Sequence, residues 1–327
     1  MPDGSTALER QILSQPEQLE AVLAEPIPAS AAERLRGVDR IWLVGTGTSQ
    51  HAAELGAAML LEAGRAAHPT SSMSFANRPP FAQGDGVILI SHNAGTETAF
   101  AGAVWTMATR AGLPVVPITR RGGAMPDAIE TVEKETSHTY TASYTAALVQ
   151  LARLAHELGA GAFTPEVLGR VPAAVGAAIA EPGTERIALP ERLLVLTGEG
   201  PASVSAREGA LKVREASRFP AEGYDVEYLL HGHAVPLNAS DHLVTLAPPD
   251  TQGLTEGVEV AARAAGIPVT RVEERADLPS PLEQIPLTVR LQILALRSAL
   301  ERGQNPDVAI EGPWDDPDLW AIGSPTS

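Results

Sequence analysis

The sequence predicts an α/β protein made of two similar domains, each a parallel sheet flanked by helices. Short apolar runs alternate with longer helix-like stretches, which is the pattern of parallel strands joined by helices. Glycines also recur at matching positions in the two halves of the chain. The length of 327 residues, 44% of them hydrophobic, suffices for about two domains of ~150 residues.

Six apolar runs are the strand candidates, and they form two sets of three. The first set is Ile41–Val44, Val87–Ile90 and Val115–Ile118, and the second is Leu193–Thr197, Leu243–Leu246 and Val269–Val272. Units of this kind bind ligands at the carboxyl ends of their strands. The residues that follow these runs are therefore the first place to look for a functional site.

The two halves align with each other as an internal duplication. Three pairs of glycines match at one offset of 153 residues (198 − 45): Gly45 with Gly198, Gly47 with Gly200, and Gly56 with Gly209. They lie in the aligned stretches RIWLVGTGTSQHAAELGAA and LLVLTGEGPASVSAREGAL. Proline and glycine punctuate the stretch from 165 to 185, as expected of a boundary. We expect two domains, residues 1–170 and 171–327.

Composition excludes several classes of function. A net charge of −16, with Lys134 and Lys212 as the two lysines, disfavours nucleic-acid binding, which depends on clustered cations. Cysteine is absent, so the 327 residues offer no disulfide, thiolate nucleophile or thiolate metal ligand. No apolar run approaches the ~20 residues of a membrane span, and MPDGSTALERQ does not read as an export signal, so we expect a cytoplasmic protein.

GTGTS at 45–49 follows the first predicted strand and opens a helix. Its glycines would let backbone N–H groups and the hydroxyls of Thr48 and Ser49 approach a ligand. The dinucleotide fingerprint needs a third glycine where Gln50 stands, which weakens that interpretation. A tight structural turn explains the segment as well as a ligand loop does.

SHNAGTET at 91–98 follows the second strand and precedes a predicted helix, Thr96–Arg110. A phosphate in front of that helix would receive the hydroxyls of Ser91 and Thr96 and donors from His92 and Asn93. Simple helix capping would need one or two such residues, so their density favours anion binding. The counterpart in the second half, APPDTQG, has prolines and an aspartate, and we expect it not to bind an anion.

EGALKVREAS at 208–217 places Glu208, Lys212 and Glu215 on one helical face, because they are four and three residues apart. A solvated ladder of salt bridges is the ordinary explanation of such spacing. Lys212 is one of the two lysines of the chain, and it lies between glutamates and shortly before the run EYLLHGH. This context favours a functional role instead. His231 and His233 alone do not complete a metal site, and we expect no metal.

In this order the segments resemble the sugar isomerase (SIS) family. The matching stretches are ERQILSQP at 9–16, GTGTS, SHNAGTET, EGALKVREAS, and EYLLHG at 227–232. The resemblance is strongest to the double-SIS isomerase half of the glutamine:fructose-6-phosphate aminotransferases. It implies two tandem SIS domains, each a three-layer αβα, flavodoxin-like unit.

The resemblance also implies roles for individual residues. Glu215 falls on the catalytic glutamate, Lys212 on the lysine one turn before it, and His231 on the histidine that opens the sugar ring in the neighbouring subunit's site. Thr48 and Ser49 match residues that hold sugar hydroxyls. The phosphate loop corresponds to Ser91, His92, Asn93 and Thr96. We therefore expect a homodimer with shared active sites, acting on a phosphorylated sugar without a metal or an organic cofactor.

Departures from the family pattern leave the substrate open. Tyr140 stands where the sugar wall usually has a serine, and no lysine follows Lys212, which removes a Schiff base from the tail. No glutaminase part has a counterpart in the sequence. We expect a phosphosugar isomerase, or an isomerase-deaminase of an amino-sugar phosphate, working through an enediol or enediolamine. The alternatives are a deglycase of phosphorylated sugar-amine adducts and a non-catalytic phosphosugar sensor.

Overall fold

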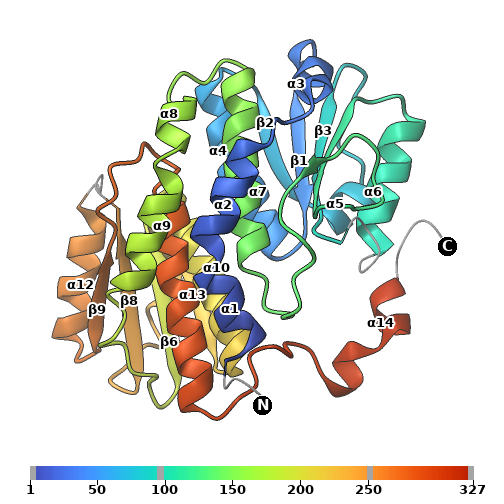
Figure 1. Cartoon of the computed structure of the whole chain (residues 1–327). Coiled ribbons are helices and arrows are strands. Elements are labelled where there is room, and N and C mark those ends of the chain that lie inside the picture. The colour runs from blue at the N-terminus through green and yellow to red at the C-terminus, as the bar shows by residue number, and fades with distance from the viewer. Residues whose placement is uncertain (1–4, 94–98, 249–252, 323–327) are drawn as a thin grey trace. The chain divides into compact units, whose positions relative to one another are not determined.

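The structure is a computed structural model that describes residues 5–93, 99–248 and 253–322 (Figure 1). It contains two compact units, each assembled from three chain segments. The first-sheet unit comprises Glu17–Glu135, Ala142–Arg170 and the segment from Ile310 onward. The second-sheet unit comprises the N-terminal segment up to Pro16, Thr136–Thr141 and Val171–Ala309. Each unit takes chain segments from both residues 1–170 and residues 171–327. The division into two contiguous domains with these bounds therefore stays a prediction.

The first-sheet unit is built on a five-stranded parallel sheet in the order β2-β1-β3-β4-β5. Its strands are β1 (Ile41–Gly45), β2 (Ala67–Ser71), β3 (Gly86–Ile90), β4 (Val115–Thr119) and β5 (Ile129–Glu130). Its helices are α3 (Ala29–Arg36), α4 (Thr48–Glu62), α5 (Ser72–Asn77), α6 (Ala99–Arg110), α7 (Ala142–Glu157) and α8 (Pro165–Leu168), followed near the C-terminus by η2 (Gly312–Asp315) and α14 (Pro317–Ala321). Helix α2 (Gln15–Ala24) begins just before this unit does.

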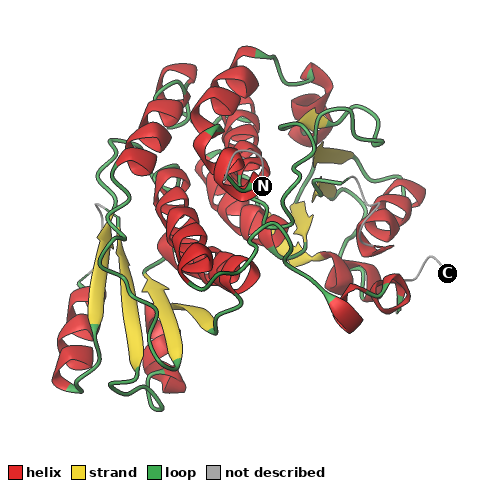
Figure 2. Cartoon of the chain, turned by 60° about the horizontal axis from the view of Figure 1, so that its bottom comes forward, coloured by secondary structure: helices red, strands yellow, loops and turns green. Residues whose placement is uncertain are grey.

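The second-sheet unit has a four-stranded parallel sheet in the order β7-β6-β8-β9, with helices on both sides (Figure 2). Its strands are β6 (Leu193–Gly198), β7 (Ala221–Asp225), β8 (Asp241–Ala247) and β9 (Val269–Glu273). Its helical segments are α1 (Ala7–Leu13), α9 (Val171–Ala180), α10 (Pro201–Ser217), α11 (Val226–Tyr228), η1 (Leu229–His233), α12 (Leu254–Ala264) and α13 (Gln284–Glu301). The predicted α/β class with two parallel sheets is confirmed.

Alternation along each strand divides the core of the second-sheet unit between two faces. Leu194 and Leu196 of β6 belong to a cluster with Val213 of α10 and Leu291 of α13. Val195, between those two leucines, belongs to the opposite cluster, which includes α12 side chains. A strand buried on both faces reads as a continuous apolar run, which is why strands such as β3, β4 and β8 were visible in the sequence. The strands not predicted, β2, β5 and β7, each have a single buried residue, and β5 is only two residues long.

The predicted duplication is visible in matching backbone geometry. Gly47 and Gly200, which precede α4 and α10, have φ values of 56° and 50°, a region that L side chains rarely adopt. Further along these helices, a Cβ on Gly56 would lie 2.9 Å from Leu151, and one on Gly209 would lie 2.5 Å from Leu291. Each glycine therefore lets its helix pack closely against the sheet and a neighbouring helix.

An arginine–aspartate pair is also repeated at the amino ends of the central strands. Arg40 donates from Nε to Asp85 at 2.9 Å, and Arg192 donates to Asp241 at 2.8 Å. Each carboxylate also accepts the backbone N–H three residues before it. Burial acts to raise the pKa of Asp85, but the hydrogen bonds from Arg40, Trp42 and the backbone outweigh it and hold that pKa below its usual range.

The NPD turn, Asn305–Asp307, joins three distant segments of the second-sheet unit. The Asp307 carboxylate accepts the backbone N–H groups of Ala7 and Leu8 at 2.8 and 2.7 Å, which caps α1. The Pro306 carbonyl accepts the hydroxyl of Thr139 at 2.9 Å. The turn therefore holds the segment Thr136–Thr141 beside α1, although more than 160 residues separate it from Asp307.

We predict that Gly209→Ala destabilises the protein by about 1–3 kcal/mol, because the new methyl group would overpack the contact between α10 and Leu291. Gly257→Ala is the matched control. Gly257 is an exposed position in α12 with nothing within 4 Å of a new Cβ, and the substitution should stabilise by about 0.5–1 kcal/mol. Urea unfolding of both variants measures this, and equal effects would contradict the packing argument.

Candidate active site

The predicted site residues belong to both units, and each group is described separately. Thr48, Ser49, Ser91, His92 and Asn93 lie in the first-sheet unit. The second-sheet unit contains the other group, Lys212, Glu215 and His231. Thr96 lies outside the described residues, as does the rest of 94–98, so its part in a phosphate loop remains a prediction.

The GTGTS segment forms a sharp turn from β1 into α4. A Cβ at Gly45 would lie 2.4 Å from the carbonyl oxygen of Ser49, so glycine is required there. The N–H groups of Ser49 and Gln50 donate to the carbonyls of Thr46 and Gly47 at 3.1 and 2.9 Å. Because these amides are used inside the turn, the half-buried hydroxyls of Thr48 and Ser49 are the groups suited to a ligand.

Ser91, His92 and Asn93 continue directly from the carboxyl end of β3, at the centre of the sheet. Chain connections leave β1 and β3 toward opposite edges, and ligands bind at such switch points in open α/β sheets. The Ser91 N–H donates to the Ile118 carbonyl at 3.0 Å, which extends the pairing with β4 beyond the strand. Ser91 is half-buried and Asn93 is buried, and α6 is described from Ala99 onward.

The ring of His92 is held by the chain itself. Its Nε2 accepts the backbone N–H of Glu135 at 3.1 Å, so the neutral ring carries its proton on Nδ1. The Glu135 carboxylate in turn accepts the N–H of Ser143 at the start of α7, at 2.7 Å. The contact between His92 and Glu135 positions the loop, and a role for His92 as a phosphate donor stays a prediction.

Arg120 is a residue that the sequence reasoning did not single out. It follows β4 directly and lies beside His92, because its backbone N–H donates to the His92 carbonyl at 3.1 Å. The signal was present in the sequence: a cation directly after the strand that neighbours the proposed phosphate loop.

The second-sheet unit contains a buried group of three charged side chains on one face of α10. The Lys212 ammonium lies 2.5 Å from Glu215 Oε2 and 3.4 Å from Glu208 Oε1. The side chains of Lys212 and Glu208 are 0% exposed, and that of Glu215 is 24% exposed. The predicted common face is therefore confirmed, and the alternative of a solvated salt-bridge ladder is wrong. Glu208, which was not among the predicted catalytic residues, completes this group.

Burial raises the pKa of the Glu215 carboxyl above its ordinary value, and the negative charge of Glu208 adds to the rise. The ammonium of Lys212 opposes the rise through its charge and its hydrogen bond. A carboxylate whose pKa is raised in this way is suited to take and return a proton near neutral pH. Its side chain remains partly exposed.

His231 is exposed on the segment that follows β7. Its Nδ1 lies 2.8 Å from the Glu227 carbonyl, and Gly232 turns the chain with φ 119°. The neighbouring His233 stacks on Tyr224 with ring centroids 4.2 Å apart. Among the described residues, no group of three or more His, Asp or Glu side chains is placed to hold a metal ion.

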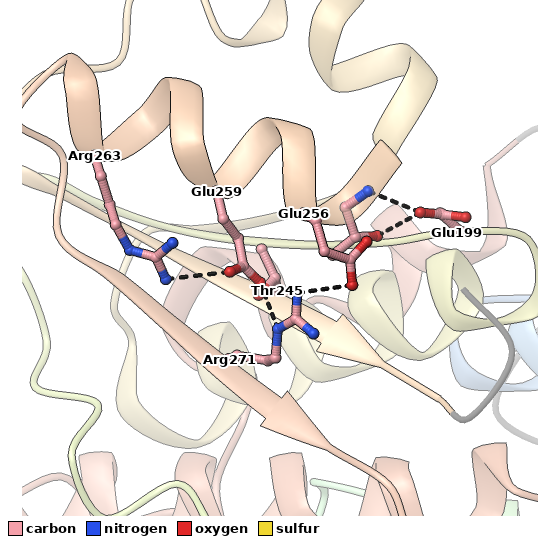
Figure 3. Close-up of polar contacts among 7 residues, drawn as sticks. Glu199, Thr245, Glu256, Glu259, Arg263 and Arg271 are labelled. Carbon is pink, nitrogen blue, oxygen red and sulfur yellow. Dashed lines mark hydrogen bonds and ion pairs between the residues drawn. The ribbon is translucent and has the colours of Figure 1, made fainter. Parts of the chain in front are cut away.

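In the second unit a carboxylate lies at the amino end of α12, the helix that follows β8 (Figure 3). Glu199, directly after β6, accepts both the N–H and the hydroxyl of Thr255 at the start of α12, at 2.7 and 2.8 Å. Thr46 occupies the equivalent position after β1. A negative charge from the chain itself thus lies at the amino end of α12, where it would repel a second anion.

An ion-pair network holds α12 on its sheet (Figure 3). Arg271 of β9 donates to Glu259 at 2.7 Å and to Glu256 at 2.8 Å. Thr245 of β8 donates to the same Glu259 at 2.7 Å. These hydrogen bonds satisfy the buried carboxylate, and we assign the network to the packing of α12.

Across residues 5–93, 99–248 and 253–322, none of the helices combines the length and the hydropathy that crossing a membrane requires.

Comparisons with known proteins agree with the sequence resemblance. No protein-family model matches the chain. It is 27% identical to a glutamine–fructose-6-phosphate aminotransferase of Pyrococcus horikoshii over 91% of this chain and 55% of that protein. A Gloeobacter violaceus protein of the same name is 28% identical over 83% of this chain and 50% of its own length. The chain thus spans about half the length of these curated relatives.

Solved structures share the fold. The tagatose-6-phosphate ketose/aldose isomerase of Escherichia coli superposes with a TM-score of 0.78 at 19% identity, covering 95% of this chain and 98% of that one. The C-terminal domain of a glucosamine-fructose-6-phosphate aminotransferase from Francisella tularensis superposes with a TM-score of 0.77 at 19% identity, covering 94% of this chain and 99% of that one. A glucosamine-6-phosphate deaminase of Thermotoga maritima superposes with a TM-score of 0.76 at 20% identity, covering 92% of this chain and 97% of that one.

We predict that Lys212→Met lowers the free energy of unfolding by about 3–5 kcal/mol, because it leaves the fully buried Glu208 without its cation. The double variant Lys212→Met with Glu208→Gln should lose clearly less, since the fully buried side chain at position 208 then carries no charge. Urea unfolding of wild type, both single variants and the double variant measures the coupling. Additive losses would contradict the pairing of Lys212 with Glu208.

Proposed function

Because the chain is similar over most of its length to glutamine–fructose-6-phosphate aminotransferases and shares the fold of phosphosugar isomerases, we propose that it is a phosphosugar isomerase of the SIS family. The substrate class is a hexose 6-phosphate or an amino-hexose 6-phosphate. The observation that carries this proposal is the buried group of Glu208, Lys212 and Glu215, since a protein that only senses a sugar has no need of it.

The proposed reaction moves a proton between C1 and C2 of the open-chain sugar. Glu215 removes the proton from one carbon and returns it to the other, which its raised pKa and partial exposure suit. The intermediate is an enediol, or an enediolamine for an amino sugar, and its negative oxygen needs a nearby cation. The Lys212 ammonium, 2.5 Å from Glu215, supplies that charge.

His231 is proposed to open the sugar ring by moving a proton between the ring oxygen and the anomeric hydroxyl. An imidazole can both donate and accept a proton, which this step requires. Ser91, Asn93 and Thr96 are proposed to bind the phosphate, and Thr48 and Ser49 to bind sugar hydroxyls, as the family resemblance implies. His92 keeps the loop in place through its contact with Glu135.

A homodimer with shared active sites is part of the proposal. Three exposed apolar side chains surround His231 in sequence: Tyr228 at 68%, Leu230 at 49% and Val235 at 83% relative exposure. A second copy of the chain would bury them and bring His231 to the neighbouring site, as the family resemblance implies. A cytoplasmic location and the absence of a cofactor stay predictions from the sequence.

We predict that Glu215→Gln slows exchange of the C2 proton with solvent by about 10²–10⁴-fold, because the amide cannot accept the proton. NMR in heavy water with a panel of hexose and amino-hexose 6-phosphates measures the rate. In wild type the rate should rise with pH through a midpoint above the ordinary glutamate pKa, since the deprotonated form is the active one.

Glu301→Gln, an exposed glutamate of α13 in the same unit, is the control and should exchange as fast as wild type. Equal rates for Glu215→Gln and wild type would disprove the catalytic assignment. If the wild type exchanges none of the sugars, the isomerase proposal itself is wrong.

Shared sites predict complementation between two inactive variants. When Glu215→Gln and His231→Ala are unfolded together and refolded, a mixed dimer has one site with both native residues. About a quarter of the wild-type exchange activity should return, from half of the dimers with one intact site of two. Activity that stays at the level of the separate variants would show that each site uses residues of one chain.

A further inference from the structure

Arg120 lies next to the proposed phosphate loop because the β3–β4 ladder continues beyond both strands. Ile90 pairs with Ile118 in the parallel register, so Arg120 comes level with His92. The carbonyl of His92 accepts the Arg120 N–H at 3.1 Å and also the Thr119 hydroxyl at 3.1 Å. The backbone of Arg120 is therefore fixed beside His92, the residue between Ser91 and Asn93.

The turn that follows Arg120 adds to this fixation. The Gly123 N–H donates to the Arg120 carbonyl at 3.1 Å, and Gly122 has φ 63°. A Cβ at Gly123 would lie 2.8 Å from the Thr119 side chain, so this position also needs glycine. The sequence Arg-Arg-Gly-Gly thus forms a tight turn that holds the first arginine at the carboxyl edge of the sheet.

The two adjacent arginines differ in their partners. Arg121 forms an ion pair with Glu25 at 2.8 Å and lies 3.9 Å from Glu133. Within the described part of the chain, no carboxylate pairs with Arg120, and its buried Nε has no hydrogen-bond partner. Its side chain donates from Nη1 to the Arg121 carbonyl at 3.1 Å, which leaves further guanidinium N–H groups for a ligand.

We propose that Arg120 binds the phosphate group of the substrate together with Ser91 and Asn93. This inference rests on the proposed function, because it takes the loop after β3 as the phosphate site. Ser91 and Asn93 are neutral, and the protein has a net charge of −16. A guanidinium supplies the missing positive charge, and its planar set of donors fits two phosphate oxygens at once. The site therefore selects a phosphate monoester over the unphosphorylated sugar.

The test compares Arg120→Gln with Arg121→Gln, using the intact protein and two probes, inorganic phosphate and glucose 6-phosphate. Isothermal titration calorimetry at fixed ionic strength measures both dissociation constants. Arg120→Gln should weaken binding of each probe by about tenfold to a hundredfold, the loss expected for a charged hydrogen bond. Arg120→Lys should restore part of the affinity, and Arg121→Gln should bind as wild type does.

Unchanged affinity in Arg120→Gln, while Ser91→Ala weakens binding, would overturn the role of Arg120 and leave the phosphate loop standing. If Arg120→Gln and Arg121→Gln weaken phosphate binding equally, the effect is one of general surface charge. That result would also overturn the role of Arg120. A wild type that binds neither probe overturns it as well. If phosphate binding depends on Arg120 but no sugar exchanges its C2 proton, the inference stands and the isomerase proposal fails.

Discussion

The buried ammonium of Lys212 is the interaction on which the second-sheet unit and its proposed chemistry depend. A lysine without exposure is tolerated because carboxylates lie 2.5 and 3.4 Å away. Removing such charges from water costs several kcal/mol per ion, and their mutual attraction rarely does more than offset that cost. A buried ion group of this kind is weak evidence for stability, so a chemical use is the better reason for its presence.

The helix that carries this group is held tightly on both sides. Gly209 allows α10 to approach Leu196 of β6 and Leu291 of α13, and apolar side chains such as Val213 fill the rest of the interface. Close packing fixes the helix and therefore the direction of the charged side chains. A proton-transfer base must be placed within a fraction of an ångström of its target, and a rigid helix face achieves this better than a loop.

The duplicated architecture has diverged in charge rather than in backbone. Both halves keep the left-handed glycine before the helix and the arginine–aspartate pair at the opposite end of the sheet. At the switch point, however, the first half presents Ser91 and the cation Arg120, whereas the second half presents Glu199 bound to Thr255. In the second half, the amino end of α12 thus has a negative partner from the chain itself, the carboxylate of Glu199.

Sequence patterns predicted what depends on local periodicity: six buried strands, the glycine pairs, and the common face of Glu208, Lys212 and Glu215. Strand β7 was missed, because its sequence AEGYD contains no apolar run. The burial of Lys212, the reach of Glu199 to Thr255 and the closeness of Arg120 to His92 were also missed. Each depends on contacts between segments distant in sequence, which no local rule contains.

The NPD turn also joins segments distant in sequence, and this affects the order in which the protein can fold during synthesis. Residues 136–141 complete a unit whose capping residue, Asp307, is synthesised about 170 residues later. The second-sheet unit therefore cannot complete the cap of α1 during synthesis until Asp307 has emerged from the ribosome.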